Sequence, residues 1–451
     1  MRAETLAGWG GQLVPGRERR SEDLAAITAD AVLTRGLGRA YGDAALPPEG
    51  VREVAGSRLA DRILAFDGER GLLRGEAGLS LRELHRLLMP RGWFTPVSPG
   101  TADVTLGGMV AADVHGKNHH VAGSFGRHVT ELLLRTGTGE IVRCSREREP
   151  ELFRATLGGM GLTGHILEVE HRLERIPSPW IRCESRRFAR LDELVAALRQ
   201  ASHQWPFTVA WLDCLRGEPR GILHCGRWCE PEEAPLHGPA TPRSLTVPFH
   251  APALLLNGAT GRAFNALVYL RQRTGRYAVH STPFFYPLDR LRRWPRLYGR
   301  RGLTQHQCVL PDAGPAEVLR LLAAVRAAGG RPFLAVLKDF GAEGDGLLSF
   351  PRPGLTLALD FAVDRHTPAM VAAINREVRA LGGRIYLAKD AFTTAVDLAA
   401  MEGERLERFR RVRERWDPEG RLASRLSRRL IDPASPGSRG GARMTMSGVH
   451  A

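Results

Sequence analysis

Apolar and polar residues alternate most clearly in the segment LTLALDFAV, residues 355–363. Successive side chains of a β-strand point to opposite faces of a sheet, so this pattern predicts a strand with two different sides. The side that we expect in the core consists of Leu355, Leu357, Leu359, Phe361 and Val363. The other side is small and polar and could form the floor of a pocket; it consists of Thr356, Ala358, Asp360 and Ala362.

Two segments near this strand have helical periodicity. Pro315 opens the first, glycines 329 and 330 end it, and its apolar face consists of Leu319, Leu322 and Val325. In the second, Thr367 can cap a helix, Pro368 suits its first turn and Gly382 ends it. The apolar face of this helix consists of Val371, Ile374, Val378 and Leu381. Helices on one face of a mainly antiparallel sheet, which is the α+β class, fit this order.

Residues 241–302 lack such periodicity. They contain several prolines, several aromatic residues and apolar runs such as Ala253–Leu256. A mobile lid or surface loop is one interpretation, and a poorly patterned segment of the core is the other.

The length of 451 residues predicts more than one domain. Residues up to about 178 are rich in glycine loops, residues 180–383 alternate helices with strands, and the remainder returns to a strand and a charged helix. From Asp432 the chain is too polar to bury a core, so a disordered tail is expected for residues 432–451. No run of eighteen apolar residues occurs and the N-terminus is polar, which predicts a cytoplasmic protein.

The net charge of +15 is carried mainly by arginine. It reflects either a codon bias that favours arginine or an anionic partner such as a phosphorylated substrate or a membrane surface. No nucleic-acid-binding motif accompanies it, so we expect no nucleic acid partner. The six cysteines form no CxxC pair; His224, Cys225 and Cys229 are close in sequence, but they belong to an expected strand at residues 222–228. We therefore predict free thiols and no metal site.

Three glycine-rich segments carry the candidate chemistry. The first loop, TRGLGRAYGDA (residues 34–44), lets the backbone approach an anion closely, but no strong helix follows it as in a Rossmann site. The second loop, SPGTADVTLGGMVAADVHGKNHH (residues 98–120), combines glycines with three histidines, one lysine and one asparagine near its end. A metal cluster there is the rival interpretation, but Lys117 would repel a cation. The third loop, GGMGLTGHI (residues 158–166), connects an apolar helix to a strand.

In this order and at these spacings, the three loops resemble the FAD-binding fold of the vanillyl-alcohol oxidase and p-cresol methylhydroxylase (PCMH) superfamily. Within it, DVHGKNHH and the following AGSFGRHV resemble the decaprenylphosphoryl-β-D-ribose 2′-oxidase branch. YPLD, the TQHQ strand, the VLKDFG turn and the YLAKD strand add to this resemblance, which covers roughly residues 5–430. It implies a PCMH-type FAD-binding domain at residues 1–179, an inserted substrate or cap domain at 180–383, and a return to the FAD domain at 384–431.

The resemblance also implies which residues hold FAD. The first loop would surround the pyrophosphate through Thr34, Arg35, Gly36, Leu37, Gly38, Arg39, Ala40, Tyr41, Gly42, Asp43 and Ala44. Further along the cofactor would lie Gly100, Thr105, Leu106, Gly107, Gly108, Ala112, Asp113, Val114, His115, Ile166 and Tyr386. Some relatives anchor the flavin covalently through a histidine in the first loop. This loop has no histidine or cysteine, so non-covalent FAD is expected.

The implied reaction is the oxidation of a secondary alcohol on a sugar-like substrate, with hydride transfer to flavin N5. Lys389 would stabilise the reduced flavin, and His115 would position or deprotonate the alcohol. The implied substrate pocket contains Lys117, Phe285, Tyr286, Gln305, Gln307, Lys338, Thr356 and Ala358. Gln305 and Gln307 share strand parity, so both amides can hold sugar hydroxyls.

Two positions depart from the branch. A cysteine common on its pocket strand is Ala358 here, and a neighbouring asparagine is Thr356. These departures leave the substrate open between a lipid-phosphate furanosyl sugar and an alditol, aminoglycoside or nucleoside.

The resemblance also implies two further partners: a separate short-chain reductase and the inner face of a membrane. Six arginines in residues 289–301 are candidates for contact with an anionic, membrane-held substrate; a solvated surface loop is the alternative.

Overall fold

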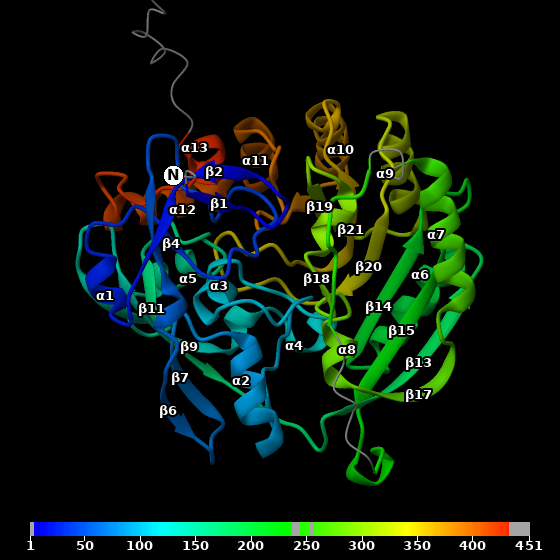
Figure 1. The fold of residues 1–451 in the computed structure, drawn as a ribbon, viewed down its shortest axis with the longest axis horizontal. Helices are drawn as coiled ribbons and strands as arrows, with labels where there is room; N and C mark the ends of the chain where they lie inside the picture. The colour runs from blue at the N-terminus through cyan, green and yellow to red at the C-terminus, as the bar shows by residue number, and fades with distance from the viewer. Residues whose placement is uncertain (1–3, 237–243, 253–256, 433–451) are drawn as a thin grey trace, which may run out of the picture.

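The computed structural model describes residues 4–236, 244–252 and 257–432. Two halves lie side by side in Figure 1: the blue and cyan N-terminal segments with the red C-terminal helices, and the green and yellow segments. One buried apolar cluster contains residues of both halves, so the halves share a core. Among the described residues, no helix is both long and apolar enough to cross a bilayer.

The first half is built on two sheets. One is parallel, in the order β3-β5-β4, with bounds Arg17–Arg20, Glu53–Gly56 and Thr34–Arg35. The other is antiparallel, in the order β10-β9-β11-β7-β6, with bounds Ile141–Ser145, Val129–Arg135, His165–Arg172, Leu72–Glu76 and Ile63–Asp67. The helices of this half are α1 (Leu24–Ile27), α2 (Leu81–Leu88), α3 (Leu106–Ala111), α4 (His119–Ala122) and α5 (Pro150–Thr156). Two short pairs complete it: β1 (Thr5–Ala7) with β2 (Leu13–Pro15), and β8 (Trp93–Phe94) with β12 (Glu174–Arg175).

The second half is an antiparallel eight-stranded sheet in the order β17-β13-β15-β14-β20-β21-β19-β22. Its strands are Gly275–His280, Trp180–Phe188, Arg220–Trp228, Phe207–Asp213, Leu334–Phe340, Gly354–Ala362, Leu303–Leu310 and Arg384–Ile385, in the same order. Its helices are α6 (Leu191–Ser202), α7 (Gly258–Arg271), α8 (Ser281–Phe285), α9 (Pro315–Ala327) and α10 (Thr367–Ala380). A parallel pair, β16 (Leu245–Thr246) with β18 (Leu291–Arg292), lies outside the sheet.

The chain then returns to the first half through α11 (Ala395–Glu402), α12 (Glu404–Trp416) and α13 (Arg425–Leu430). The sheet extends to Ile385, two residues beyond 383, because β22 pairs with β19. Residues 433–451 of the expected tail lie outside the described residues.

The two expected helices and the alternating strand are present as α9, α10 and β21. Val371, Ile374 and Val378 are buried as expected, while Leu381 lies at the edge of the core. In α9 the core residues are Val318, Leu321, Leu322 and Val325, and Leu319 is only partly buried.

The cap predicted at Thr367 was wrong by one residue. His366 precedes the helix, and Thr367 is its first residue. The hydroxyl of Thr367 accepts a hydrogen bond from the Asp364 amide at 2.9 Å, so a tight turn already starts at Asp364.

Two segment predictions need correction. The VLKDFG segment is not a turn: residues up to Phe340 belong to β20, because β21 pairs with them along their whole length. The YLAKD segment is not a strand: the strand ends just before it, at Arg384–Ile385. After Tyr386 the chain turns, with the Lys389 amide donating to the Tyr386 carbonyl at 3.0 Å. We call residues 386–391 the return turn.

The lid interpretation of residues 241–302 was also largely wrong. The segment contains α7, the edge strand β17 and α8, and the side chains of Trp294 and Tyr298 are buried. The sequence of this segment shows no clear helical periodicity, because the residues of α7 that point inward are not apolar. Residues 241–243 and the run 253–256 lie outside the described part of the chain.

Candidate active site

One face of the eight-stranded sheet carries most of the predicted substrate residues. Residues directly paired across antiparallel strands share a face, and Gln307 pairs with Ala358, which pairs with Val336. By the same register, Gln305 pairs with Asp360, and Lys338 pairs with Thr356. The small, polar side predicted for residues 355–363 therefore lies beside both glutamines and Lys338. Asp360 belongs to this face too; the alternation placed it on the polar side, but nothing in the sequence marked it as a site residue.

His115 of the second loop lies against this face. Its Nε2 is 3.1 Å from Gln307 Nε2, and its Nδ1 is 3.3 Å from Lys338 Nζ. Gln307 also donates to Thr356 Oγ1 at 3.1 Å. Burial lowers the pKa of His115 well below its usual value, and the positive charge of Lys338 lowers it further. His115 is therefore a neutral imidazole at neutral pH.

Aromatic rings surround His115 on its other sides. The rings of Phe340, Phe350 and Tyr386 have centroids 4.8, 5.7 and 5.3 Å from the imidazole. Tyr386 stacks on Phe350 and donates its hydroxyl to the Ala112 carbonyl at 3.0 Å. Phe340 and Phe350 were not predicted, because an apolar residue that lines a site has no sequence signal that separates it from the core.

Three partly buried lysines converge on the same region. Burial lowers the pKa of Lys338 to about 7, and those of Lys117 and Lys389 to about 8. None of the three forms an ion pair with a described residue. The negative charge of Asp360 partly opposes the shift at Lys389, and burial in turn raises the pKa of Asp360 to about 6. The region therefore has an excess of partly buried cationic groups, which favours an anionic ligand.

Phe285 and Tyr286 lie further from His115. Phe285 packs against Phe94 and Trp228, and the Tyr286 hydroxyl contacts Ser98 and His85. Lys117 connects them to the other two lysines near His115: its ammonium donates to the carbonyls of Phe284 and Phe285 at 2.6 and 3.3 Å.

The first loop packs tightly on both the second loop and the return turn. A Cβ at Gly36 would lie 2.4 Å from Thr105 Oγ1, and one at Gly42 would lie 1.7 Å from the Asp390 carbonyl oxygen. The Tyr41 amide donates to the Ala388 carbonyl at 3.0 Å, and the Lys389 ammonium lies 3.8 Å from the centre of the Tyr41 ring. Lys389 is thus placed against the first loop.

Most polar side chains of the first loop hold the loop itself. Thr34 contacts His165 Nδ1 at 2.7 Å, Arg35 pairs with Glu18, Arg39 donates to the Asp103 carbonyl, and Asp43 pairs with Arg429. The other members, Leu37, Gly38, Ala40 and Ala44, have no polar side-chain group, so the loop offers a ligand mainly backbone groups. The φ of +63° at Gly38 is in the left-handed region that glycine adopts without strain.

The second and third loops divide into packed and open positions. Leu106 is fully buried, Gly107 packs on Ala77, and Thr105 caps α3 by accepting from the Gly108 amide. The Asp113 carboxylate accepts hydrogen bonds from Ser124 and Gly126, Val114 is buried, and Ile166 lies within β11. Gly100 differs: it is exposed, and a Cβ there would meet no atom within 4 Å.

The packing of the glycine-rich loops and the position of the lysines fit a bound FAD. Close-packed glycine loops that present backbone groups suit a dinucleotide pyrophosphate, and a partly buried cluster of lysines suits a flavin that becomes negative on reduction. The His119 Nε2 atom, buried beside Phe340 without a hydrogen-bond partner, is a further polar group available to a ligand. In the described part of the chain, no three His, Cys, Asp or Glu residues are grouped to hold a metal ion. All six cysteines are buried free thiols, as predicted.

Comparison with known proteins decides the family. A family model described as an FAD binding domain matches residues 22–145. Decaprenylphosphoryl-β-D-ribose oxidase of Mycolicibacterium smegmatis is 35% identical over 411 residues, which cover 88% of this chain and 89% of that protein. The chain belongs to this family of FAD-linked oxidoreductases.

The similarity to other relatives is consistent with this family. An uncharacterized Streptomyces coelicolor protein from the mprA 5′ region is 35% identical over 372 residues, 78% of this chain and all of that protein. L-gulonolactone oxidase of Bos taurus is 33% identical over 111 residues, 24% of each chain. The predicted superfamily, its PCMH-type FAD-binding fold, the FAD cofactor and an enzyme that acts on CH–OH groups are thereby confirmed.

Proposed function

We propose that this enzyme oxidises a secondary alcohol of a furanosyl sugar that carries a lipid phosphate, and so forms a ketone. The name of the 35% identical relative supports this substrate class. A separate short-chain reductase would then reduce the ketone from the opposite face, which gives net 2′-epimerisation for cell-wall arabinan.

The observation that carries the proposal is the row of polar residues on the sheet face beside His115 and the partly buried lysines. The amides of Gln305 and Gln307 are suited to sugar hydroxyls, and the ammonium group of Lys117 is suited to a phosphate. The FAD domain would comprise residues 1–179 and 384–431, with residues 180–383 as the substrate domain.

The contacts of His115 suggest a path for the alcohol proton. A substrate hydroxyl that replaces the Gln307 amide at Nε2 would give its proton to His115. The imidazole would release the proton of Nδ1 to Lys338 Nζ, which is 3.3 Å away and has a pKa of about 7. FAD, when bound, supplies the acceptor for the two electrons. Lys389, against the first loop, compensates the negative charge that reduction produces.

A soluble short-chain polyprenylphosphoryl ribose tests the proposal. Anaerobic mixing with the FAD-loaded enzyme should bleach the flavin and yield a product two hydrogen atoms lighter. The 2′-deoxy analogue is the control and should leave the flavin oxidised. Equal bleaching by both compounds, or by neither, would refute the assignment of the 2′-hydroxyl.

Ala358 supports a second candidate, an alditol, aminoglycoside or nucleoside alcohol. It is directly opposite Gln307 and leaves room where the branch has a larger thiol side chain. Bleaching by one of these compounds, with none by the lipid phosphate, would establish the second candidate.

A further inference from the structure

Helix α7 is held to the sheet through polar contacts. The buried Asn265 side chain donates to Asp213 Oδ1 at 3.1 Å. At the C-terminal end, the Arg187 guanidinium donates to the carbonyls of Tyr269, Leu270 and Gln272 at 2.6, 2.8 and 2.7 Å. The residues that fix the helix are therefore not its large aliphatic ones.

The large apolar residues of α7 point outward instead. Phe264, Leu267 and Leu270 are 58%, 50% and 69% exposed. An ordinary surface helix buries its apolar stripe and exposes its polar residues, so α7 is reversed. A contiguous exposed apolar strip of this kind marks an interaction surface.

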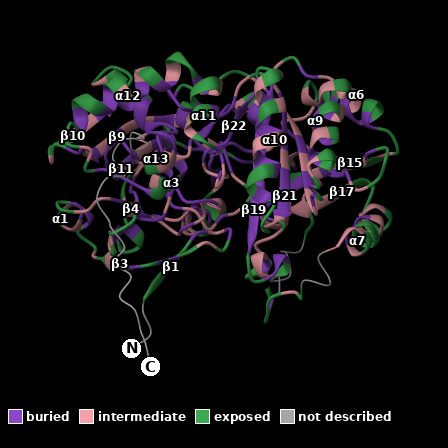
Figure 2. Cartoon of the chain, turned by 90° about the horizontal axis from the view of Figure 1, so that it is seen from above, coloured by how far each residue is buried: buried purple, intermediate pink, exposed green. Residues whose placement is uncertain are grey.

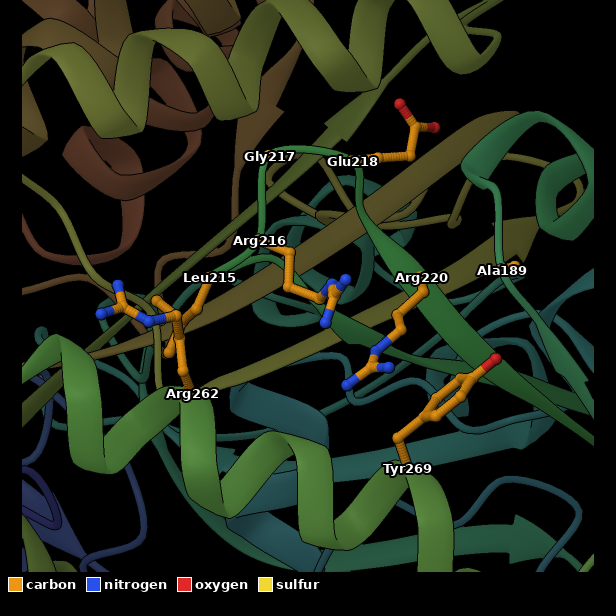
Figure 3. Close-up of a pocket in the computed structure, with 8 residues that line it drawn as sticks. All are labelled: Ala189, Leu215, Arg216, Gly217, Glu218, Arg220, Arg262 and Tyr269. Atoms are coloured by element: carbon orange, nitrogen blue, oxygen red, sulfur yellow. The ribbon is translucent and has the colours of Figure 1, made fainter.

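The surroundings of this strip are cationic. No Asp or Glu occurs between Glu233 and Asp289. Arg276 pairs with Glu184, but Arg262, Arg271 and Arg273 form no ion pair with any described residue. Beneath the helix is a pocket of about 720 Å³, where Arg216 and Arg220 turn toward each other and the Glu218 carboxylate points away (Figure 3).

Helix α7 also lies on the sheet face that carries the candidate active site. The row of paired residues that starts at Gln307 and Ala358 continues through Val336, Trp211 and Ile222 to Arg187. Arg187 is the residue that binds the C-terminal end of α7. Figure 2 shows α6, α9 and α10 together on one side of the sheet and α7 apart from them on the other.

We propose that the outer face of α7 docks on an anionic phospholipid bilayer. The α7 docking face consists of Phe264, Leu267, Leu270, Arg271 and Arg273. Its apolar side chains would enter the headgroup region while its arginines bind lipid phosphates, as in interfacial amphipathic helices. This docking would bring the enzyme to the surface that holds a lipid-linked sugar, a consequence that rests on the proposed function; the docking itself does not depend on the reaction.

Vesicle flotation with the full-length FAD-loaded enzyme tests the proposal. The enzyme should bind phosphatidylcholine vesicles that contain phosphatidylglycerol at least tenfold more tightly than pure phosphatidylcholine vesicles, and added salt should weaken the binding. The variant F264Q/L267Q/L270Q and the variant R271Q/R273Q should each lose at least tenfold in binding. Both should retain the flavin spectrum and flavin reduction by a soluble substrate, because these side chains lie on the surface.

Matched controls separate this surface from others. Val396→Gln removes an equally exposed apolar residue on α11 and should bind vesicles like the wild type. So should R290Q/R292Q/R293Q, which neutralises the arginine segment predicted from sequence. Unchanged binding by the α7 variants, or loss of binding in the R290Q/R292Q/R293Q variant alone, would overturn the proposal. A wild-type dimer that F264Q/L267Q/L270Q dissociates, without vesicle binding, would also overturn it and assign the face to a second copy.

Discussion

Individual partly buried lysines give this site its electrostatic character. An ammonium in a low-dielectric interior is costly unless an anion compensates it, and Asp360 is the carboxylate whose charge acts on Lys389. The lowered pKa values of Lys117, Lys338 and Lys389 have burial as their main cause. A bound anion would raise them again, so the ligand-free site is poised to accept negative charge.

Replacement of Lys389 by Ala should abolish most of the flavin reduction by substrate while FAD stays bound. A fixed cation stabilises the reduced flavin more than the oxidised one, and the loss of such a donor costs about 3 kcal/mol, or roughly a hundredfold in rate. The measurement is the anaerobic rate of flavin bleaching, with Lys389→Arg as a charge-retaining control. A Lys389→Ala enzyme that bleaches as fast as the wild type would show that Lys389 does not act on the flavin.

The pH dependence of catalysis should report Lys338. Its pKa is lowered to about 7 by burial and by the neighbouring lysines, and the proposed proton path requires the neutral amine. Deprotonation of Lys338 increases as pH rises, so kcat/KM should rise through pH values near 7 and fall again when the Lys389 ammonium, whose pKa is about 8, loses its proton. In Lys338→Met the rising limb should disappear and the maximal rate should fall; a rising limb that persists unchanged would assign it to another group.

At the residue scale, sequence could predict identities but not distances. Strand parity placed Gln305 and Gln307 together, and the alternation of residues 355–363 placed Thr356 and Ala358 on the same polar side. The 3.3 Å contact between His115 and Lys338 joins two residues that are far apart in sequence. No local pattern contains that information.

At the scale of elements, the glycine loops act through close backbone packing. Gly42 has no room for a side chain beside Asp390, whereas Gly100 faces open space. The two positions separate a structural role from a ligand-binding one.

Gly100→Ala should therefore fold normally but bind FAD several-fold more weakly, because the added methyl group meets no protein atom and can clash only with a ligand. Gly217→Ala, at a similarly open position in the β14–β15 turn, is the matched control and should change neither property. The measurements are thermal unfolding of the apoprotein and FAD titration. Unaltered affinity in Gly100→Ala would place the cofactor elsewhere.

The composition of the first loop predicts that the flavin is not covalently bound and can be released. Residues 34–44 contain no histidine or cysteine that could form a covalent bond to the isoalloxazine ring. Acid precipitation should leave FAD in the supernatant and a colourless pellet. Flavin retained in the pellet would reveal a covalent attachment.

Elements with regular amphipathic periodicity, such as α9, α10 and β21, were predictable from sequence. Helix α7 was not, because its apolar residues face outward and its fixing contacts are polar. The turn after Tyr386 was missed for a different reason: an alternating pattern cannot show that pairing with β19 ends at the Tyr386 amide, which donates to the Gln307 carbonyl.

At the scale of the whole molecule, the FAD half is assembled from both ends of the chain. Arg429 of α13 binds Asp43 of the first loop at 2.7 Å and Asp390 of the return turn at 2.8 Å. It also donates to the Thr393 carbonyl at 2.6 Å. Burial raises the pKa of Asp390, but the positive charge of Arg429, together with hydrogen bonds from Arg429 and Thr393, holds that pKa below its usual value.

Arg429→Met should destabilise the whole chain and weaken FAD binding, because it leaves two buried carboxylates without a cation. Removal of one partner from such a network costs about 3 kcal/mol, although the partial exposure of Arg429 reduces this figure. Thermal unfolding and FAD affinity measure the two effects, and Arg428→Met, which removes the exposed neighbouring arginine, should leave both unchanged.

The pKa of Asp390 is lowered in the folded state, so this carboxylate contributes to the free energy of unfolding above a pH of about 4, the pKa of an unfolded Asp. The contribution is lost as pH falls further. The stability difference between Arg429→Met and the wild type should therefore shrink in acid; a difference that stays constant with pH would mean that Arg429 stabilises the chain by packing instead of by charge.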